Sequence, residues 1–596
     1  MCGIWAIFGS NIDMCSHFKA AYKIAHRGPD AFRLETIYQI PSCCLGFHRL
    51  AILDVQHGMQ PMRVSQHPHI WLIYNGEIYN HQNLKEQFGF QYATNCDGEA
   101  IIHLYVQGGI EFTARQLDGV FAFCLLDTAN RKVYLGRDTF GVKPLFRVLT
   151  AGGILSACSE VKGLMDMVDI SAHVKIQEVM SGHVETYNLD SEFRTSFEKI
   201  YQFHRIGDPP LYTTFAKVLE NDTKASIRIL LESSVEKRMM ADRRMGCVLS
   251  GGLDSSLITA LLVKLARKRD LNYTIQTFSI GLDGSHDLLA ARKVALYLGT
   301  EHHEIVFSPD EAISAIENVI YHLESYDAPT IRGAVGMYLL CKYVKENTDT
   351  TVLLSGEGAD EIAQGYNHFH IAPSAEDADR ESRRLCKDIC LFDVRRVDRN
   401  SAAFGLEIRV PFLDHHFSSY YLSLDPELKM PHNGVEKELL RYAFKDTGLL
   451  PTEILWRPKE AFADGMASPT KSWIECIQNF VEGQIHDSEM EFYSQQYSHN
   501  IPISKESLYY RRIFEKFFPG QGHLIPYFWT PKWSVAFRNA SLFCSKGIRY
   551  TVDTKVKTLH PTMLHIKLDK NESIQQKKDF RKKNALDPLF GPAETN

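Results

Sequence analysis

Several features that mark common protein classes are missing from the sequence. No Gly-Lys pair occurs in its 596 residues, so the chain lacks the P-loop whose lysine binds nucleotide phosphates in many ATPases. No apolar run approaches the length of a membrane span, and no basic stretch precedes the short apolar one at the amino terminus. The 13 cysteines form no Cys-x-x-Cys pair, which argues against a zinc ribbon. We therefore expect neither a membrane anchor nor a secretory leader.

The composition is that of a soluble globular protein. Hydrophobic residues make up 44% and charged residues 23%, and the chain is too long for one hydrophobic core, so two large domains are expected. The formal net charge of −6 argues against a general nucleic-acid binder. An odd number of scattered cysteines fits free thiols in a reducing compartment, so the expected location is the cytosol.

A seven-residue stretch at 250–256, SGGLDSS, carries the strongest single signal. The apolar run 245–249 before it predicts a buried strand, and the periodic apolar run after it predicts a helix. Such a turn gathers backbone N–H groups at the positive end of a helix, and its two glycines let the backbone approach a phosphate. Asp254 would repel that phosphate unless a cation lies between them, so we expect Mg²⁺ there. The alternative is a serine-rich helix cap after a buried strand.

The stretch resembles the pyrophosphate-binding loop (SGGxDS) of the ATP pyrophosphatase family. Members of that family cleave ATP to AMP and pyrophosphate while they adenylate a carboxylate or a carbonyl group. The resemblance implies a nucleotide site of a different type from the P-loop.

Cys2 is the second candidate, because of its place in the chain. Removal of Met1 would leave a cysteine with a free α-amino group, whose ordinary pKa is about 8. That amine can act as the base for its own thiol, so one residue would supply both nucleophile and base. A buried structural thiol is the alternative for a cysteine at this position.

The residues that follow Cys2 carry a second resemblance. The motifs, in chain order, are CGI at 2–4, HRGPD at 26–30, GFHRL at 46–50, YNGEIYN at 74–80, DGE at 97–99, LDGVFA at 117–122 and RD at 137–138. Together they resemble the class II glutamine amidotransferase domain, in which an amino-terminal cysteine hydrolyses glutamine to glutamate and ammonia. The resemblance covers 2–187 and implies an αββα sandwich, with which the apolar alternation at 71–74 and 120–126 is compatible.

The chemistry of glutamine agrees with the matching positions. Arg49 offers a bidentate fork to the α-carboxylate, and Glu77 and Asp97 offer carboxylates to the α-ammonium group. The Asn75 amide and the Gly76 N–H match the donors of an oxyanion hole. By resemblance, the backbone of one further segment lines the glutamine pocket: Leu50, Ala51, Ile52 and Leu53. Taken singly, each charged residue is explained as well by a solvated surface, and Asn75-Gly76 by a hairpin turn.

After a linker expected at 188–210, strand and helix signals alternate. Apolar runs at 245–249, 274–280, 304–307 and 352–354 predict strands, and 287–298 predicts a helix. The alternation predicts a doubly wound parallel sheet, whose ligands bind at the carboxyl ends of its strands.

A second loop, SGEGADE at 355–361, would then share the sheet edge with SGGLDSS. Asp254 and Asp360 would jointly hold Mg²⁺ on the pyrophosphate, and Glu357 is a candidate base for an incoming ammonium or amine. The alternative for this loop is a solvated acidic start of a helix.

Two later motifs, GLEIRVPFLD at 405–414 and WRPKEAF at 456–462, complete the pattern. With the two loops they resemble the carboxy-terminal half of the glutamine-dependent asparagine synthetase family. Lys459 would stabilise charge on the phosphates and the intermediate, and Arg332 matches an arginine of the aspartate site. The resemblance implies an ATP site formed by Val248, Ser250, Gly251, Gly252, Asp254, Ser255, Ile280, Ser355 and Gly356.

Some positions are less well defined by this resemblance. Arg399, Glu407 and Arg409 lie in matching segments, but their roles stay open. Pro329 stands where the family usually has threonine in a TTxR pattern, and the missing hydroxyl and N–H put a contact to aspartate or AMP in doubt.

The expected function is ATP-dependent synthesis of asparagine from aspartate, with ammonia from glutamine and a β-aspartyl-AMP intermediate. The expected division is an amidotransferase domain at 2–187, a linker at 188–210, a synthetase domain at 211–540 and a partly disordered tail at 541–596. We expect ATP as a substrate and Mg²⁺ as a cofactor, and we expect neither nucleic acid nor a membrane as a partner. The sequence is compatible with a homodimer. The rival functions are another carboxylate-adenylating enzyme such as a β-lactam synthetase, another class II amidotransferase, and a non-catalytic glutamine or nucleotide sensor.

Overall fold

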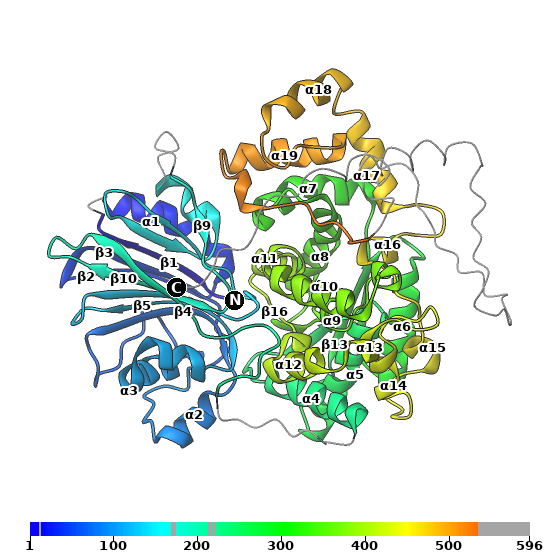
Figure 1. Ribbon diagram of the computed structural model, residues 1–596, viewed down its shortest axis with the longest axis horizontal. Helices are drawn as coiled ribbons and strands as arrows, with labels where there is room; N and C mark the ends of the chain where they lie inside the picture. Colours follow the sequence, from blue (N-terminus) through cyan, green and yellow to red (C-terminus); the bar gives the residue numbers. More distant parts are fainter. Residues whose placement is uncertain (11–12, 168–173, 213–218, 220–221, 534–596) are drawn as a thin grey trace, which may run out of the picture. The chain divides into compact units, whose positions relative to one another are not determined.

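The computed structural model describes residues 1–10, 13–167, 174–212, 219 and 222–533 (Figure 1). The tail expected at 541–596 therefore lies outside the described residues. Over the described part, two antiparallel sheets are followed by one parallel sheet with helices.

The first half folds as two stacked antiparallel sheets. The six-stranded sheet has the order β2-β3-β1-β8-β7-β9, and the five-stranded sheet has the order β11-β10-β6-β5-β4. The strands are β1 (Gly3–Phe8), β2 (Ala31–Ile37), β3 (Ile40–Arg49), β4 (Ile70–Ile78), β5 (Gly119–Asp127), β6 (Lys132–Arg137), β7 (Phe146–Leu149), β8 (Leu155–Cys158), β9 (Gln177–Glu178), β10 (His183–Leu189) and β11 (Thr195–Gln202).

Strand alternation assigns each apolar side chain to one layer of this half. Ile4 and Phe8 of β1 pack with Ile73 of β4 in the core between the sheets, whereas Trp5 and Ile7 face the helix α1 (Met14–Tyr22). The helices α2 (His81–Phe88) and α3 (Glu99–Gln116) lie on the opposite side, next to β4 and β5 (Figure 1). These layers confirm the expected αββα sandwich.

Strand β11 lies inside the segment 188–210, where a linker is expected. It is an edge strand, and most of its side chains are exposed, so its sequence shows little apolar periodicity. The five-stranded sheet therefore continues to Gln202, and only the residues after Gln202 connect it to the next sheet.

The second half contains the predicted parallel sheet. Its order is β14-β13-β12-β15-β16, and every neighbouring pair is parallel. The strands are β12 (Met245–Val248), β13 (Gln276–Gly281), β14 (Glu301–Val306), β15 (Val352–Leu354) and β16 (Glu407–Arg409). Four of the five match the predicted strands to within a few residues. The fifth, β16, has only three residues and was not predicted.

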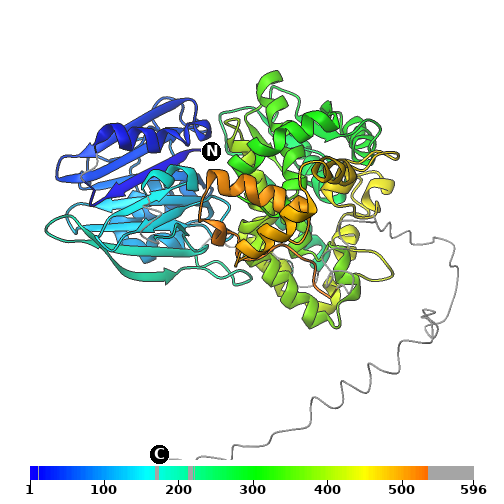
Figure 2. The same ribbon diagram turned by 90° about the horizontal axis from the view of Figure 1, so that it is seen from above.

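Helices cover both faces of this sheet, as a doubly wound fold requires. In Figure 1, α8 and α11 lie above β13 and β16, and α4 and α5 lie below. The last α-helix of the described residues, α19, packs on α7 and faces the viewer in Figure 2. The helices are α4 (Thr223–Lys237), α5 (Leu253–Lys268), α6 (His286–Leu298), α7 (Pro309–Leu323), α8 (Ala328–Asn347), α9 (Ala359–Ile362), α10 (Ala375–Asp388), α11 (Asp393–Ala402), α12 (His415–Ser423), α13 (Pro426–Lys429), α14 (Glu438–Phe444), α15 (Thr452–Leu455), α16 (Phe462–Gly465), α17 (Trp473–Glu482), α18 (Asp487–Gln496) and α19 (Lys505–Phe517).

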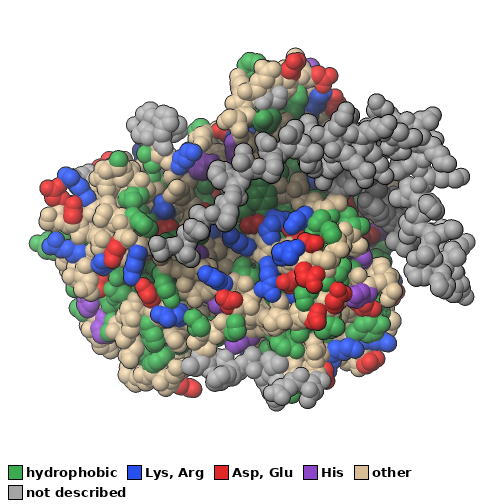
Figure 3. Space-filling view, in the orientation of Figure 1, with side chains coloured by type: hydrophobic (Ala, Val, Ile, Leu, Met, Phe, Trp, Pro, Cys, Tyr) green, Lys and Arg blue, Asp and Glu red, His purple; other side chains and the backbone are tan. Residues whose placement is uncertain are grey.

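Charge is mixed on the surface in view. Basic and acidic side chains lie side by side on the face shown in Figure 3. Among the described helices, none is long and apolar enough to cross a bilayer.

Candidate functional site

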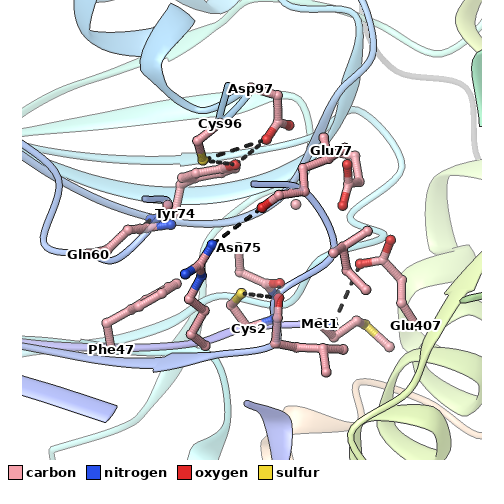
Figure 4. A pocket seen from close by; sticks show the side chains of 16 residues that line it. Met1, Cys2, Phe47, Gln60, Tyr74, Asn75, Glu77, Cys96, Asp97 and Glu407 are labelled. Carbon is pink, nitrogen blue, oxygen red and sulfur yellow. Dashed lines mark hydrogen bonds and ion pairs between the residues drawn. The ribbon is translucent and has the colours of Figure 1, made fainter. Parts of the chain in front are cut away.

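Cys2 opens onto a pocket at one end of the antiparallel sheets (Figure 4). Its backbone nitrogen donates to Asn75 Oδ1 at 2.9 Å, and its thiol lies 3.6 Å from the carbonyl oxygen of Leu50. The pocket is lined by Met1, Cys2, Phe47, Arg49, Leu50, Ile52, Leu53, Gly58, Gln60, Tyr74, Asn75, Gly76, Glu77, Cys96, Asp97 and Glu407. The structure thus gathers almost all residues of the predicted glutamine pocket, since only Ala51 is outside this set.

Met1 affects the state of Cys2. Met1 is buried, and its terminal ammonium group lies 3.6 Å from Glu407. While Met1 is present, the nitrogen of Cys2 belongs to a peptide bond and is not basic. Burial also raises the pKa of the Cys2 thiol, so this thiol needs a nearby base to become a nucleophile.

Two buried carboxylates face the pocket. Asp97 accepts hydrogen bonds from the Tyr74 hydroxyl and from the Ile78 N–H, and burial raises its pKa. Glu77 lies 3.1 Å from the guanidinium of Arg409, and burial raises its pKa against the opposing effect of that arginine. A cationic group that entered the pocket would therefore meet two desolvated carboxylates.

Arg49 shapes the loop that follows β3. Its guanidinium donates to three backbone carbonyls: Leu53 at 3.3 Å, Asp54 at 2.5 Å and Val55 at 3.0 Å. Arg49 is only 6% exposed and still lines the pocket. It thus fixes the backbone of residues 53–55, in addition to the ligand-binding role expected of it.

Asn75 and Gly76 lie in β4 beside the Cys2 thiol. The Asn75 Nδ2 group is buried and has no hydrogen-bond partner, so it is available to a ligand oxygen. A Cβ at position 76 would lie 2.1 Å from the carbonyl oxygen of Val120, so only glycine fits. The role of the two positions as oxyanion donors stays a prediction.

Replacement of Asn75 by alanine removes that unpaired donor. We expect glutamate release from glutamine to fall about 10²- to 10³-fold in kcat, the usual effect of losing one oxyanion donor. The measurement is steady-state glutaminase activity, with Asn95→Ala, an exposed position, as the control. An unchanged kcat together with a raised KM would show that Asn75 binds the substrate without stabilising the oxyanion.

The two glycine-rich loops meet at the carboxyl ends of adjacent strands. The 250–256 loop joins β12 to α5, and the 355–361 loop follows β15. A Cβ on Gly356 would lie 2.7 Å from the Ser255 nitrogen, so the loops are in direct contact. Gly251 has φ +73°, and a Cβ there would meet the Ala291 nitrogen at 2.4 Å. The predicted sharing of one sheet edge is confirmed.

The other predicted nucleotide residues lie at the same edge. Ser250 and Ser255 hydroxyls are 3.1 Å apart, and Val248 and Ile280 lie near the ends of the paired strands β12 and β13. Arg457, which was not predicted, fastens the first loop: it donates to the carbonyl of Ser250 at 3.2 Å and to Asp287 at 2.8 Å.

Two lysines bridge the acidic residues of these loops. Lys437 lies 2.5 Å from Asp254 and 2.5 Å from Asp360, and Lys459 lies 2.5 Å from the other oxygen of Asp360. Burial alone would raise the pKa of Asp360, but the two lysines outweigh it and hold that pKa far below the usual range. Lys437 was not predicted, because no local pattern marks a lysine whose partners are distant in sequence.

The acidic pair suits a magnesium ion that also binds phosphate. Asp254 Oδ1 is buried and has no hydrogen-bond partner, which leaves a carboxylate oxygen available as a ligand. Among the described residues, no cluster of three or more histidine, cysteine or acidic side chains could hold a metal by itself. Any ion here would therefore depend on ligand oxygens, as Mg²⁺ commonly does.

Glu357 belongs to the second loop, and its carboxylate lies 3.0 Å from the guanidinium of Arg396. Burial raises the pKa of Glu357, while Arg396 opposes the rise. A carboxylate with a raised pKa is better suited to accept a proton near neutral pH than an exposed one.

Arg332 has a protein partner. It lies on α8 and makes a bidentate pair with Glu506 of α19, at 2.8 and 2.6 Å. Pro329 occupies the first turn of α8, where its missing N–H is not needed, and the Asp327 cap accepts from the Thr330 N–H at 3.1 Å. Pro329 therefore leaves the start of the helix intact.

Comparisons with known proteins cover most of the chain. The family described as glutamine amidotransferase domain matches residues 1–209, and the family described as asparagine synthase matches 226–383 and 371–544. The chain is 54% identical over 542 residues to the asparagine synthetase [glutamine-hydrolyzing] of Gallus gallus, which covers 89% of the chain and 96% of that relative. The proteins of the same name from Cricetulus griseus and Homo sapiens are 52% and 51% identical over 541 residues, with the same coverage.

Proposed function

Because the chain belongs to the glutamine-hydrolysing asparagine synthetases, we propose that its two candidate sites divide that family's reaction between them. The enzyme makes asparagine from aspartate in an ATP-dependent reaction that uses glutamine as the nitrogen donor. The reaction passes through β-aspartyl-AMP and yields AMP, pyrophosphate and glutamate. The main support for placing glutamine hydrolysis at a separate site is the pocket around Cys2, which contains an unpaired amide donor and two buried carboxylates.

In the proposed glutaminase step, Cys2 attacks the side-chain amide carbon of glutamine after Met1 has been removed. The freed α-amine of Cys2 takes the thiol proton and then passes it to the leaving ammonia. Asn75 Nδ2 and the Gly76 N–H bind the oxyanion of the tetrahedral intermediate. Water then attacks the resulting thioester, which releases glutamate and restores the thiol.

The same pocket would hold the amino-acid end of glutamine. Its α-carboxylate would bind at Arg49, and its α-ammonium group would bind between Glu77 and Asp97. The backbone of Leu50, Ala51, Ile52 and Leu53 would line the remaining wall. Two desolvated carboxylates favour a cationic group, which supports this orientation of the substrate.

In the proposed synthetase step, ATP lies across the two loops, and a carboxylate oxygen of aspartate displaces pyrophosphate from the α-phosphorus. Ser250, Gly251, Gly252, Ser255, Ser355 and Gly356 would bind phosphate oxygens, and Val248 and Ile280 would contact adenine and ribose. Lys459 would stabilise the charge that develops on the phosphates, and we add Lys437 to that role because of its place between Asp254 and Asp360. Mg²⁺, held by these two aspartates, would neutralise further charge on the pyrophosphate.

Ammonia completes the reaction by attacking β-aspartyl-AMP. Glu357 is the proposed base that takes the proton lost from the attacking ammonia, and Arg332 is the proposed contact of aspartate. Ammonia protonates in bulk water and is then not a nucleophile, so we infer that it passes to the second site inside the protein.

Several further assignments remain proposals. We place the amidotransferase domain at 2–187 with its sheet continuing to Gln202, the linker within 188–210, the synthetase domain at 211–540 and a tail at 541–596. A cytosolic location, a homodimer and the absence of nucleic-acid and membrane partners are inferred from the family resemblance and from the composition.

The test of the proposed function follows pyrophosphate release from ATP and Mg²⁺. We expect release to require aspartate, and asparagine to form with either glutamine or ammonium as donor. Pyrophosphate release at the same rate with and without aspartate would contradict the assignment of aspartate as the substrate. It would point to Pro329, at the start of α8, as the reason. If no pyrophosphate is released with either donor, the result would favour the alternative of a non-catalytic glutamine or nucleotide sensor.

A further inference from the structure

Strand β16 belongs to the parallel sheet, yet its charged side chains reach the glutamine pocket. Glu407 lines that pocket, and Arg409 Nη2 lies 3.1 Å from Glu77 Oε1. Glu407 and Arg409 are 2% and 1% exposed, so both charges are withdrawn from water. The synthetase half therefore supplies part of the wall of the glutaminase pocket.

We propose that Arg409 is a positioning residue for glutamine hydrolysis, which holds the Glu77 carboxylate where it binds the α-ammonium group of glutamine. This inference rests on the proposed role of Glu77 as a glutamine-binding residue. It assigns to the second half of the chain an indirect part in substrate binding by the first half, through Glu77.

The guanidinium of Arg409 is fixed on the side away from Glu77. Its Nε donates to Glu407 at 2.8 Å, and its Nη1 donates to the carbonyls of Arg238 and Met240 at 2.8 and 2.7 Å. Only Nη2 remains; it forms an ion pair with Glu77 and has no hydrogen-bond partner of its own. The guanidinium is planar, so three hydrogen bonds from Nε and Nη1 also fix the direction in which Nη2 points. A lysine ammonium group on its flexible chain would not be fixed in this way.

Glu77 has one unpaired oxygen for the ligand. Its Oε2 is buried and has no hydrogen-bond partner, whereas Oε1 faces Arg409. A glutamine α-ammonium group at Oε2 would complete the partners of this carboxylate. In this arrangement Arg409 holds Oε1 of Glu77, so that Oε2 points toward the α-ammonium group of glutamine.

The charged groups that face Glu77 come from three parts of the chain. Burial raises the pKa of Glu77; Arg409 opposes this rise most strongly, Glu407 and Asp97 increase it, and Lys143 lowers it. Loss of the Arg409 charge would therefore raise the pKa of Glu77 further. Glu77 binds an ammonium group only when it is ionised. Without the Arg409 charge, glutamine binding would therefore be lost at a higher pH than in the wild-type enzyme.

Arg409 also contacts the nucleotide site through its backbone. Its carbonyl accepts a hydrogen bond from the N–H of Ser355, the first residue of the second loop, at 2.9 Å. One residue thus contacts the ATP loop with its main chain and the glutamine pocket with its side chain.

The experiment measures glutamate release by the full-length enzyme as a function of glutamine concentration and pH. We expect Arg409→Met to raise KM for glutamine roughly 10- to 100-fold, as the loss of a charge-assisted contact would, with a smaller change in kcat. The acidic limb of kcat/KM should move to higher pH in this variant. Arg409→Lys keeps the charge, so it should restore most of the acidic limb while KM stays raised.

Arg238→Met is the matched control. Arg238 is another buried arginine, and its backbone carbonyl accepts a hydrogen bond from Arg409; its side chain pairs with Asp414 at 3.0 Å and lies over the Tyr79 ring. We expect this variant to lose stability without a shift of the acidic limb.

Three results separate the possible failures. Wild-type KM and pH dependence in Arg409→Met, or the same shift in Arg238→Met, would overturn the inference. If Arg409→Met does not fold, Arg409→Lys decides, because an unchanged KM in that variant would overturn the inference as well. Absence of glutamate release by the wild-type enzyme would instead refute the proposed function itself.

Discussion

Replacement of Cys2 by alanine is expected to abolish asparagine synthesis from glutamine while synthesis from ammonium continues. The Cys2 thiol is the proposed nucleophile that forms the thioester, so glutamate release should fall by about 10⁴-fold or more. The nucleotide loops lie far from Cys2 in sequence and make their own contacts, so the ammonium reaction should keep its rate. The measurement compares asparagine and glutamate formation with each donor.

Cys15→Ala is the matched control for this substitution, because Cys15 is an exposed thiol close to Cys2 in sequence. It should leave both donor reactions unchanged. Glutamine-dependent synthesis by Cys2→Ala at the wild-type rate would exclude the proposed nucleophile. Equal loss of both reactions would point to a structural role for Cys2 at the start of β1.

The second large effect is expected at Asp360, which the structure places between two lysines. Replacement by asparagine keeps the shape but removes the charge that pairs with Lys437 and Lys459. Loss of one proposed magnesium ligand should lower pyrophosphate release by about 10³-fold, since metal-assisted charge stabilisation contributes several kcal/mol. The effect should be the same with glutamine and with ammonium.

Glutaminase activity serves as the internal reference for Asp360→Asn, since the pocket around Cys2 does not contain this residue. Asp349→Asn is the matched control, because its carboxylate is 69% exposed and pairs only with Arg244 in the described contacts. If added Mg²⁺ restored Asp360→Asn to the wild-type rate, the residue would tune metal affinity and would have little part in the chemical step.

Local sequence predicted the parts of both sites that depend on local structure. The SGGLDSS loop lies between an apolar strand and an apolar-periodic helix, and both elements form where the pattern places them. The helix predicted at 287–298 begins one residue earlier, at His286, behind the Ser285 cap, and ends before Gly299 in the left-handed region. Caps, glycine turns and apolar periodicity act over a few residues, so they are readable without the fold.

Weakly patterned segments were harder to predict for the same reason. Strand β11 carries mostly exposed side chains and resembles a linker, and β16 is too short to show a period. Both strands form because a neighbouring strand offers its backbone N–H and C=O groups, and that neighbour is not visible in the local sequence.

By itself, the sequence determined which residues can carry the chemistry: a thiol next to the amino terminus, an amide beside a glycine, and carboxylates behind two glycine-rich loops. Only the tertiary structure determined which charged side chains pair with the charged groups of the two sites. Lys437 meets Asp254 across 183 residues, Arg332 meets Glu506 across 174, and Arg409 comes from the parallel sheet to face Glu77. A buried charge needs a partner wherever the fold provides one, and that partner is chosen by proximity in space, which no local pattern encodes.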